Sequence, residues 1–205
     1  MHQKTFTYYA DTTLKVVVYS FEYETPSQPF LVKKASYRTS TAPIDLSVDN
    51  NLIAIADLMK SVSIVEYEKG TAGRPDTLNE IARHFQTTWG TAVAQVDENL
   101  FLESDAENNL MVLEHNVKGL TADDRRRLQP TSEMCLGEMV NKIRRITVPT
   151  TPEAVVIPRA FLATVRALVC KWLRMEADVQ TGGGIHLPLR THRSRQAGST
   201  HATSD

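Results

Sequence analysis

The sequence predicts an all-β protein, and more specifically part of a β-propeller, from three observations. Short runs rich in β-branched and aromatic residues alternate with turn residues along the first 115 positions. One stretch of this pattern recurs after 48 residues, close to the ~40–45 residues of a propeller blade. Asp11, Asp57 and Asp105 each precede an apolar strand-like run, where their carboxylates can bond the turn backbone. We therefore expect about three four-stranded blades.

The individual strands are placed by composition and by their turn residues. They are expected at residues 14–21, 30–39, 44–48, 52–56, 61–67, 91–96, 99–104 and 109–115. Residues 78–85 are ambiguous, because Leu78, Ile81, Ala82 and Phe85 have helical spacing in a short segment surrounded by strands. Both a strand and a helix remain open there.

The repeated phrase is VDNNLIAIADLMKSVSIVEY at 48–67 and VDENLFLESDAENNLMVLEH at 96–115. Six identities recur in register, at 48/96, 49/97, 51/99, 52/100, 57/105 and 66/114. Chance similarity between two hairpins is the alternative to a repeated blade. In the first copy the expected turn carries Leu58 and Met59, although turns usually favour small polar residues.

The C-terminal half is expected to begin with a short surface helix in GLTADDRRRLQ (119–129), capped by Thr121. Its three arginines are expected to face solvent. Residues 134–148 predict a strand or strand pair, and 154–157 and 160–165 are strand-like. Beyond them, apolar residues at 161, 165, 168, 169 and 172 have helical spacing, so we expect a divergent tail over 166–205. A helix to about 177 and disorder thereafter are expected.

Composition narrows the class of protein. The chain has 205 residues, is 41% hydrophobic and has a formal net charge of −1, which gives no support for a general attraction to nucleic acid or membrane. Two cysteines favour a reducing compartment, and no secretory signal or membrane span is expected. Cys135, between Met134 and Leu136, is expected in the core. No catalytic, metal or cofactor motif stands out, because His84 and His115 lack metal-ligand spacing.

Specific residues then point to a family. The segments IADLMKSVSIVEY, LNEIARHFQTTWGTAVAQVDENLFLESDAENNLMVLEHN, GLTADDRRRLQ and LGEMVN occur in that order. Together they resemble the C-terminal propeller of damage-specific DNA-binding protein 1 proteins, the large adaptors of cullin-4 ubiquitin ligases. The resemblance covers about residues 7–165, which we assign to an incomplete propeller. The large subunit of the cleavage and polyadenylation specificity factor and a splicing factor 3b subunit share this architecture.

The resemblance implies a WD-repeat-like, seven-bladed propeller and a non-enzymatic interaction scaffold. In the family, a pocket between two propellers takes a helical segment of substrate receptors. The matching partner-binding residues here are Leu58, Met59, Lys60, Trp89, Met139 and Asn141. An apolar turn beside an aromatic side chain suits the apolar face of a helix. Two alternatives remain open at this stage, namely a loop covering Leu58 and Met59, and packing of Trp89 between blades. Three positions depart from the family: Lys60 replaces a common Arg, Met139 an aromatic, and Asp45 a larger apolar residue.

The resemblance also implies the partners. Receptors are expected to bind directly, the cullin-4 ligase through parts absent from this chain, and nucleic acid only indirectly, in the nucleus and also the cytoplasm. The alternative function is an RNA-processing scaffold in polyadenylation or splicing. We expect the chain to be a fragment at both ends, with a tail that is either genuine or a gene-model error. Exposed blade faces are expected to make it marginally stable alone.

Overall fold

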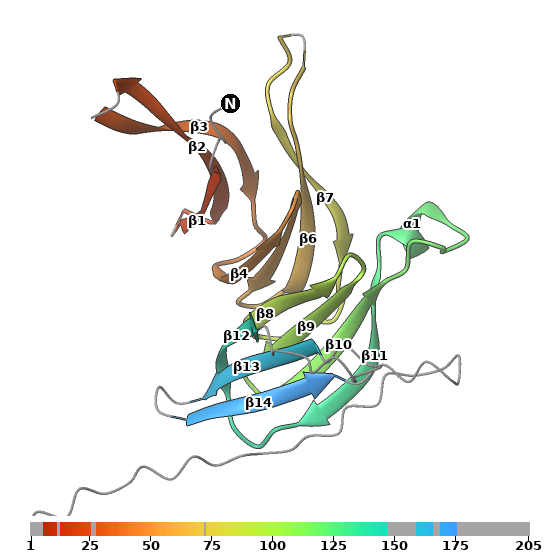
Figure 1. Cartoon of the computed structure of the whole chain (residues 1–205). Helices are drawn as coiled ribbons and strands as arrows, with labels where there is room; N and C mark the ends of the chain where they lie inside the picture. Colours follow the sequence, from red (N-terminus) through yellow and green to blue (C-terminus); the bar gives the residue numbers. More distant parts are fainter. Residues whose placement is uncertain are drawn as a thin grey trace, which may run out of the picture.

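The computed structural model describes residues 6–11, 13–25, 28–71, 73–146, 159–165 and 169–175. Within these residues the chain forms four antiparallel sheets, each built from strands that follow one another in sequence (Figure 1). The prediction of a mostly β protein with repeated four-stranded sheets is confirmed. Two sheets have four strands, and two have three strands among the residues described.

The sheets follow the chain in order. The first sheet contains β1 (Phe6–Asp11), β2 (Lys15–Thr25) and β3 (Gln28–Arg38). The second contains β4 (Pro43–Asp49), β5 (Leu52–Asp57), β6 (Ser61–Glu68) and β7 (Thr77–Arg83). The third contains β8 (Gly90–Asp97), β9 (Leu100–Asp105), β10 (Asn109–His115) and β11 (Leu128–Cys135). The fourth contains β12 (Val140–Ile146), β13 (Arg159–Val165) and β14 (Val169–Met175).

The repeat of 48 residues corresponds to one sheet. Strand β9 begins and ends 48 residues after β5, and the first strands β4, β8 and β12 contact one another in series. The Val93 amide donates to Asp45 Oδ2 (3.1 Å), and the Gln95 amide donates to Ser47 Oγ (3.0 Å). Both bonds join residues 48 positions apart, so the inner edge of β8 is satisfied by side chains of β4. The alternative explanation of the repeat, chance similarity between two hairpins, is therefore wrong.

Three apolar clusters lie between consecutive sheets. Ile53 and Ile55 pack toward the first sheet, whereas Ala54 and Ala56, which alternate with them on β5, pack toward the third. Phe101, fully buried on β9, belongs to the cluster between the second and third sheets. A further cluster, around Leu102, joins the third sheet to β12. Strands β5 and β9 are buried on both faces for this reason, which explains the nearly continuous apolar sequence of β5, whereas the second half of β9 buries Glu103, Ser104 and Asp105.

The ambiguous segment 78–85 is strand β7 from Thr77 to Arg83, so the helical alternative is wrong. It pairs with β6 along one edge as the outer strand of the second sheet, and Leu78 and Ala82 enter different inter-sheet clusters. The expected segment 134–148 contains the end of β11 and the whole of β12. Cys135 is exposed, so its assignment to the core was wrong; alternation along the outer strand β11 puts it on the solvent side.

The helix expected from the apolar spacing of residues 161–172 is also wrong. Within it, Arg159–Val165 and Val169–Met175 are strands β13 and β14, paired in register from Arg159↔Met175 to Val165↔Val169. β12 supplies an edge for this hairpin, and its hydrogen bonds outweigh a weak helical periodicity. The segment 154–157 and the tail after residue 175 lie outside the described residues.

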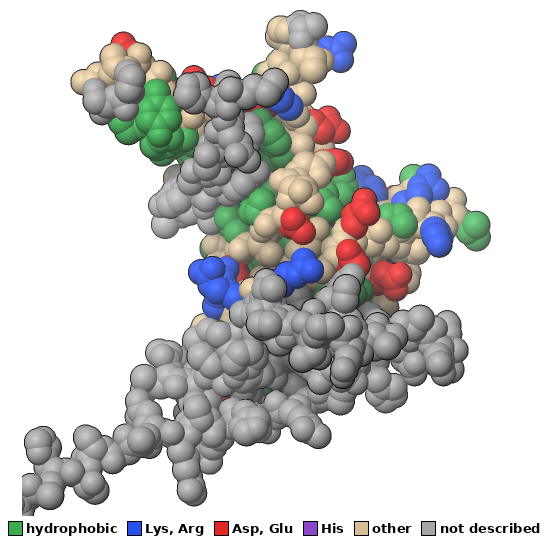
Figure 2. All heavy atoms as spheres, viewed as in Figure 1, with side chains coloured by type: hydrophobic (Ala, Val, Ile, Leu, Met, Phe, Trp, Pro, Cys, Tyr) green, Lys and Arg blue, Asp and Glu red, His purple; other side chains and the backbone are tan. Residues whose placement is uncertain are grey.

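The short helix is present as α1 (Ala122–Arg125). Thr121 is its N-cap, with the Asp124 amide donating to Thr121 Oγ1 (3.0 Å) and the Thr121 hydroxyl donating to Asp124 Oδ2 (2.7 Å). Hydrogen bonding from Thr121 holds the pKa of Asp124 below its usual value. Residues 125–127 are exposed, and Figure 2 shows basic side chains on this projection. No described helix is long or apolar enough to cross a membrane.

Candidate protein-interaction face

The turn between β5 and β6 can carry apolar side chains because other residues supply its hydrogen bonds. The Met59 amide lies 3.3 Å from Asp57 Oδ1 and 3.1 Å from Thr41 Oγ1, and the Leu58 amide donates to the Ala42 carbonyl (2.9 Å). Asp105 does the same in the next sheet, accepting from the Glu107 amide (3.0 Å). The expectation that aspartates bond the turn backbone is confirmed for Asp57 and Asp105. The side chains at the tip of the turn are therefore not needed to bond its backbone.

The apolar turn side chains face outward. Leu58 is 38% exposed and Met59 is 45% exposed, so no loop in the described part of the chain covers them. Lys60 beside them is exposed as well. The corresponding turn of the third sheet carries Ala106 and Glu107, so the apolar turn of the second sheet is not repeated there.

Trp89 stands next to this turn. It immediately precedes Gly90, the first residue of β8, where an added Cβ would lie 3.1 Å from the Asp57 carbonyl oxygen. The preceding residue joins the same turn, because the Ser61 amide donates to the Thr88 carbonyl (3.1 Å). Trp89 is 56% exposed, so it does not fill the space between blades. The fold thus places the backbone before β8, which carries Trp89, beside the turn that carries residues 58–60.

Met139 and Asn141 lie one sheet further along. The Trp89 carbonyl accepts from the Ala106 amide (2.9 Å), and the Leu136 amide donates to the Asn108 carbonyl (2.8 Å). Met139 precedes β12 as Trp89 precedes β8, and these two strands contact each other. Met139 is 42% exposed, and Asn141 is exposed at the start of β12. All six residues chosen from the sequence therefore lie in loops or strand ends on one face.

Two exposed apolar residues near this face were missed by sequence reasoning. Ile44, at the start of β4, is 48% exposed, and Phe85, after β7, is 59% exposed. Ile44 leads an alternating strand, which was the available signal. The Arg127 guanidinium carbon lies 4.9 Å from the centroid of the Phe85 ring. This cation–π contact packs the residue after β7 against the loop after α1.

A buried polar network fixes the loop that carries Trp89. Ser61 Oγ lies 2.7 Å from His84 Nδ1 and 2.7 Å from Glu103 Oε1, and the Thr88 hydroxyl donates to Glu103 Oε1 (3.0 Å). His84 Nδ1 is also 3.1 Å from Glu103 Oε2. Serine, histidine and carboxylate form hydrolase triads, but Ser61 and Glu103 are fully buried here. With no access for substrate, the network holds two sheets together.

Asp45 has a structural role at the position where a larger apolar residue was expected. It is buried on β4, where it accepts from the Val93 amide of β8 and pairs with Lys142 of β12. The Lys142 ammonium also reaches the Leu46 carbonyl (3.3 Å). One carboxylate therefore joins the first strands of three sheets.

The described part of the chain contains no group of three or more His, Cys, Asp or Glu side chains that could hold a metal ion. The face described above consists of exposed apolar side chains, a lysine and an amide on antiparallel β-sheets. The protein belongs to the class of β-propeller-like domains built from successive antiparallel sheets.

Comparison with known proteins defines the family. The model of the CPSF A subunit region matches residues 12–170, and the chain belongs to this family. It is 32% identical to DNA damage-binding protein 1 of Schizosaccharomyces pombe over 146 residues, which are 71% of this chain and 13% of that protein. It is 30% identical to DNA damage-binding protein 1a of Arabidopsis thaliana over 122 residues, which are 58% of this chain and 11% of the relative. The tomato protein (Solanum lycopersicum) is 32% identical over 124 residues, with the same coverage. The chain thus spans about an eighth of these relatives or less.

Proposed function

We propose that this chain is a non-enzymatic scaffold whose exposed face binds a helical segment of a substrate receptor, as in an adaptor of a cullin-4 ubiquitin ligase. The observation that carries the proposal is the grouping of Leu58, Met59 and Trp89 at adjacent loops with 38%, 45% and 56% exposure. Single exposed apolar side chains are common on monomers, whereas a contiguous group of large ones often marks a binding surface. An aromatic anchor beside two flexible aliphatic side chains suits the ridge of an amphipathic helix.

The remaining members define the edge of the proposed site. Lys60 and Asn141 add a charge and an amide at the rim, where polar contacts select the partner more than they raise the affinity. Met139 extends the apolar surface toward β12. Contact with the cullin would require parts of the relatives outside this chain, and contact with DNA would pass through the receptor. We propose a nuclear location, shared with the cytoplasm, on the same family grounds.

The test is binding of a cullin-4 substrate receptor to the full 205-residue chain, measured by biolayer interferometry. Trp89→Ala should weaken binding by at least tenfold, because a central aromatic anchor commonly contributes ~2 kcal/mol or more. Leu120→Ala is the matched control, since Leu120 is 96% exposed on the α1 loop and should change nothing. Equal affinities for wild type and Trp89→Ala would remove Trp89 from the site.

An RNA-processing scaffold is the second candidate, favoured by the family model, whose description refers to a CPSF subunit. The relatives described above favour the ligase adaptor. Capture of polyadenylation or splicing subunits by the same face, with no binding of cullin-4 receptors, would select the second candidate.

A further inference from the structure

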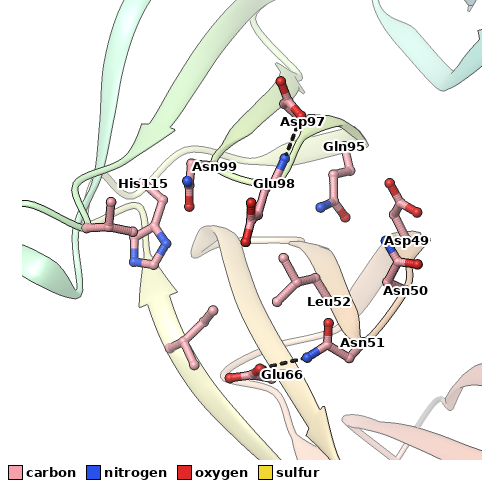
Figure 3. Close-up of a pocket in the computed structure, with 12 residues that line it drawn as sticks. Asp49, Asn50, Asn51, Leu52, Glu66, Gln95, Asp97, Glu98, Asn99 and His115 are labelled. Carbon is pink, nitrogen blue, oxygen red and sulfur yellow. Dashed lines mark hydrogen bonds between the residues drawn. The ribbon is translucent and has the colours of Figure 1, made fainter.

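A polar pocket of about 420 Å³ lies at the ends of the sheets opposite the Leu58–Lys60 turn. The turn between β4 and β5 forms one wall, and the equivalent turn between β8 and β9 forms the other. These turns belong to the two copies of the repeated phrase, and the shared residues Asp49/Asp97 and Asn51/Asn99 line the pocket from two neighbouring sheets (Figure 3). Each copy of the repeated phrase therefore contributes an aspartate and an asparagine to the same cavity.

The lining is strongly anionic. Asp49, Glu66, Asp97 and Glu98 contribute four carboxylates, and no lysine or arginine is among the described residues that line the pocket. The imidazole of His115 also lines the pocket, and its Nε2 lies 2.8 Å from the Arg125 carbonyl oxygen. A cation is the ligand that suits this lining.

A buried amide gives an independent sign of a missing ligand. Gln95, on β8, is only 7% exposed, and its side chain points into the pocket between Glu98 and Asp49 (Figure 3). Its Oε1 is buried and has no hydrogen-bond partner. A buried acceptor without a donor destabilises a fold, so such a group usually meets a partner that the isolated protein lacks.

The spacing of the groups excludes a metal ion and favours an extended organic cation. No three carboxylate or imidazole groups in the described residues are close enough together to hold a metal. A guanidinium presents five N–H donors in a planar fork and can serve several separated acceptors at once. We propose that this pocket receives an arginine side chain from a basic segment of a partner protein. This site is separate from the apolar face and does not depend on the function proposed for that face.

The first test is fluorescence polarisation with the full 205-residue chain and a fluorescein-labelled hexapeptide holding two arginines separated by two glycines. The double variant Asp49→Asn, Glu98→Gln keeps side-chain size and should weaken binding about tenfold, with weaker binding at higher salt. Glu107→Gln is the matched control, since it removes an exposed turn carboxylate at the other end of the third sheet. Equal affinity of the double variant and wild type, or an equal loss in the control, would overturn the proposal.

Gln95→Met tests the amide without changing charge. It should weaken peptide binding about threefold while leaving the thermal midpoint unchanged or raised, because the unpaired buried oxygen is removed. A merely structural glutamine would lower the midpoint and leave the affinity of the folded fraction unchanged, which would count against the assignment. Replacing both peptide arginines by citrulline should abolish binding. Spermine competing better than the arginine peptide would overturn the assignment to a protein segment.

Discussion

Removing the Glu103 carboxylate should greatly weaken the junction between the second and third sheets. Glu103 is fully buried on β9, and its oxygens lie within 3.1 Å of Ser61 Oγ, Thr88 Oγ1 and His84 Nδ1. Three of these four residues come from β6 or from the loop after β7, so the contacts cross between sheets. The change Glu103→Leu keeps an apolar side chain of similar reach but removes every acceptor.

The expected cost follows from the bonds that are lost. Hydrogen bonds to a charged group contribute about 1.5–3 kcal/mol each, and Ser61 can still bond His84 in the variant. The bonds that are not recovered, with a buried polar group left unpaired, therefore predict a loss of about 3–5 kcal/mol. A chain of this size loses about 2–4 °C of melting temperature per kcal/mol, so the midpoint should fall by roughly 10 °C.

The assay is urea and thermal unfolding of the full chain, followed by circular dichroism. Glu133→Leu, at an exposed position of β11, is the matched control and should stay within ~0.5 kcal/mol of wild type. Should Glu103→Leu fail to fold, Thr88→Val removes one bond and should cost about 1.5 kcal/mol. A loss below ~1 kcal/mol for Glu103→Leu would refute the reasoning.

Two further predictions concern other contacts between sheets. Asp45→Leu should lower the free energy of unfolding in urea by ~2–3 kcal/mol, because it leaves the Val93 amide without an acceptor. Lys142→Met should lower it by under ~1 kcal/mol, because the Lys142 side chain is one-third exposed. Equal losses for the two variants would contradict this assignment. Burial and a hydrogen bond to Glu80 raise the pKa of Tyr37 to about 12, which favours its neutral form in the folded state. Its contribution is therefore complete below pH ~10 and lost as pH rises from about 10 to about 12, and Tyr37→Phe should flatten this part of a plot of stability against pH. Tyr23→Phe, at a 61% exposed position, should leave the slope unchanged, and a slope that survives in Tyr37→Phe would exclude the assignment.

Local sequence was sufficient for the repeated strands and for α1. The strands around Ile53 and Leu102 are short, apolar and bounded by aspartate turns, and these signals act within a few residues. Thr121 and Asp124 form a capping box, and the four consecutive residues from 121 to 124 are sufficient to predict it. The outward position of Leu58 could be anticipated from its place in a turn, once its neighbour Asp57 supplies the turn hydrogen bonds.

Packing between sheets decided what local patterns left open. Residues 78–85 and the apolar positions from 161 to 172 have helical spacing, yet the strands formed there pair with β6 and within the β13–β14 hairpin. Asp45 looked misplaced in the sequence because its partners, Val93 and Lys142, are 48 and 97 residues away. The polar pocket behind Gln95 depends in the same way on two turns that meet only when sheets stack. Local sequence patterns thus predicted the strands around Ile53 and Leu102. Contacts between residues distant in sequence determined which groups share a face, because only the tertiary structure sets the distances between separate sheets.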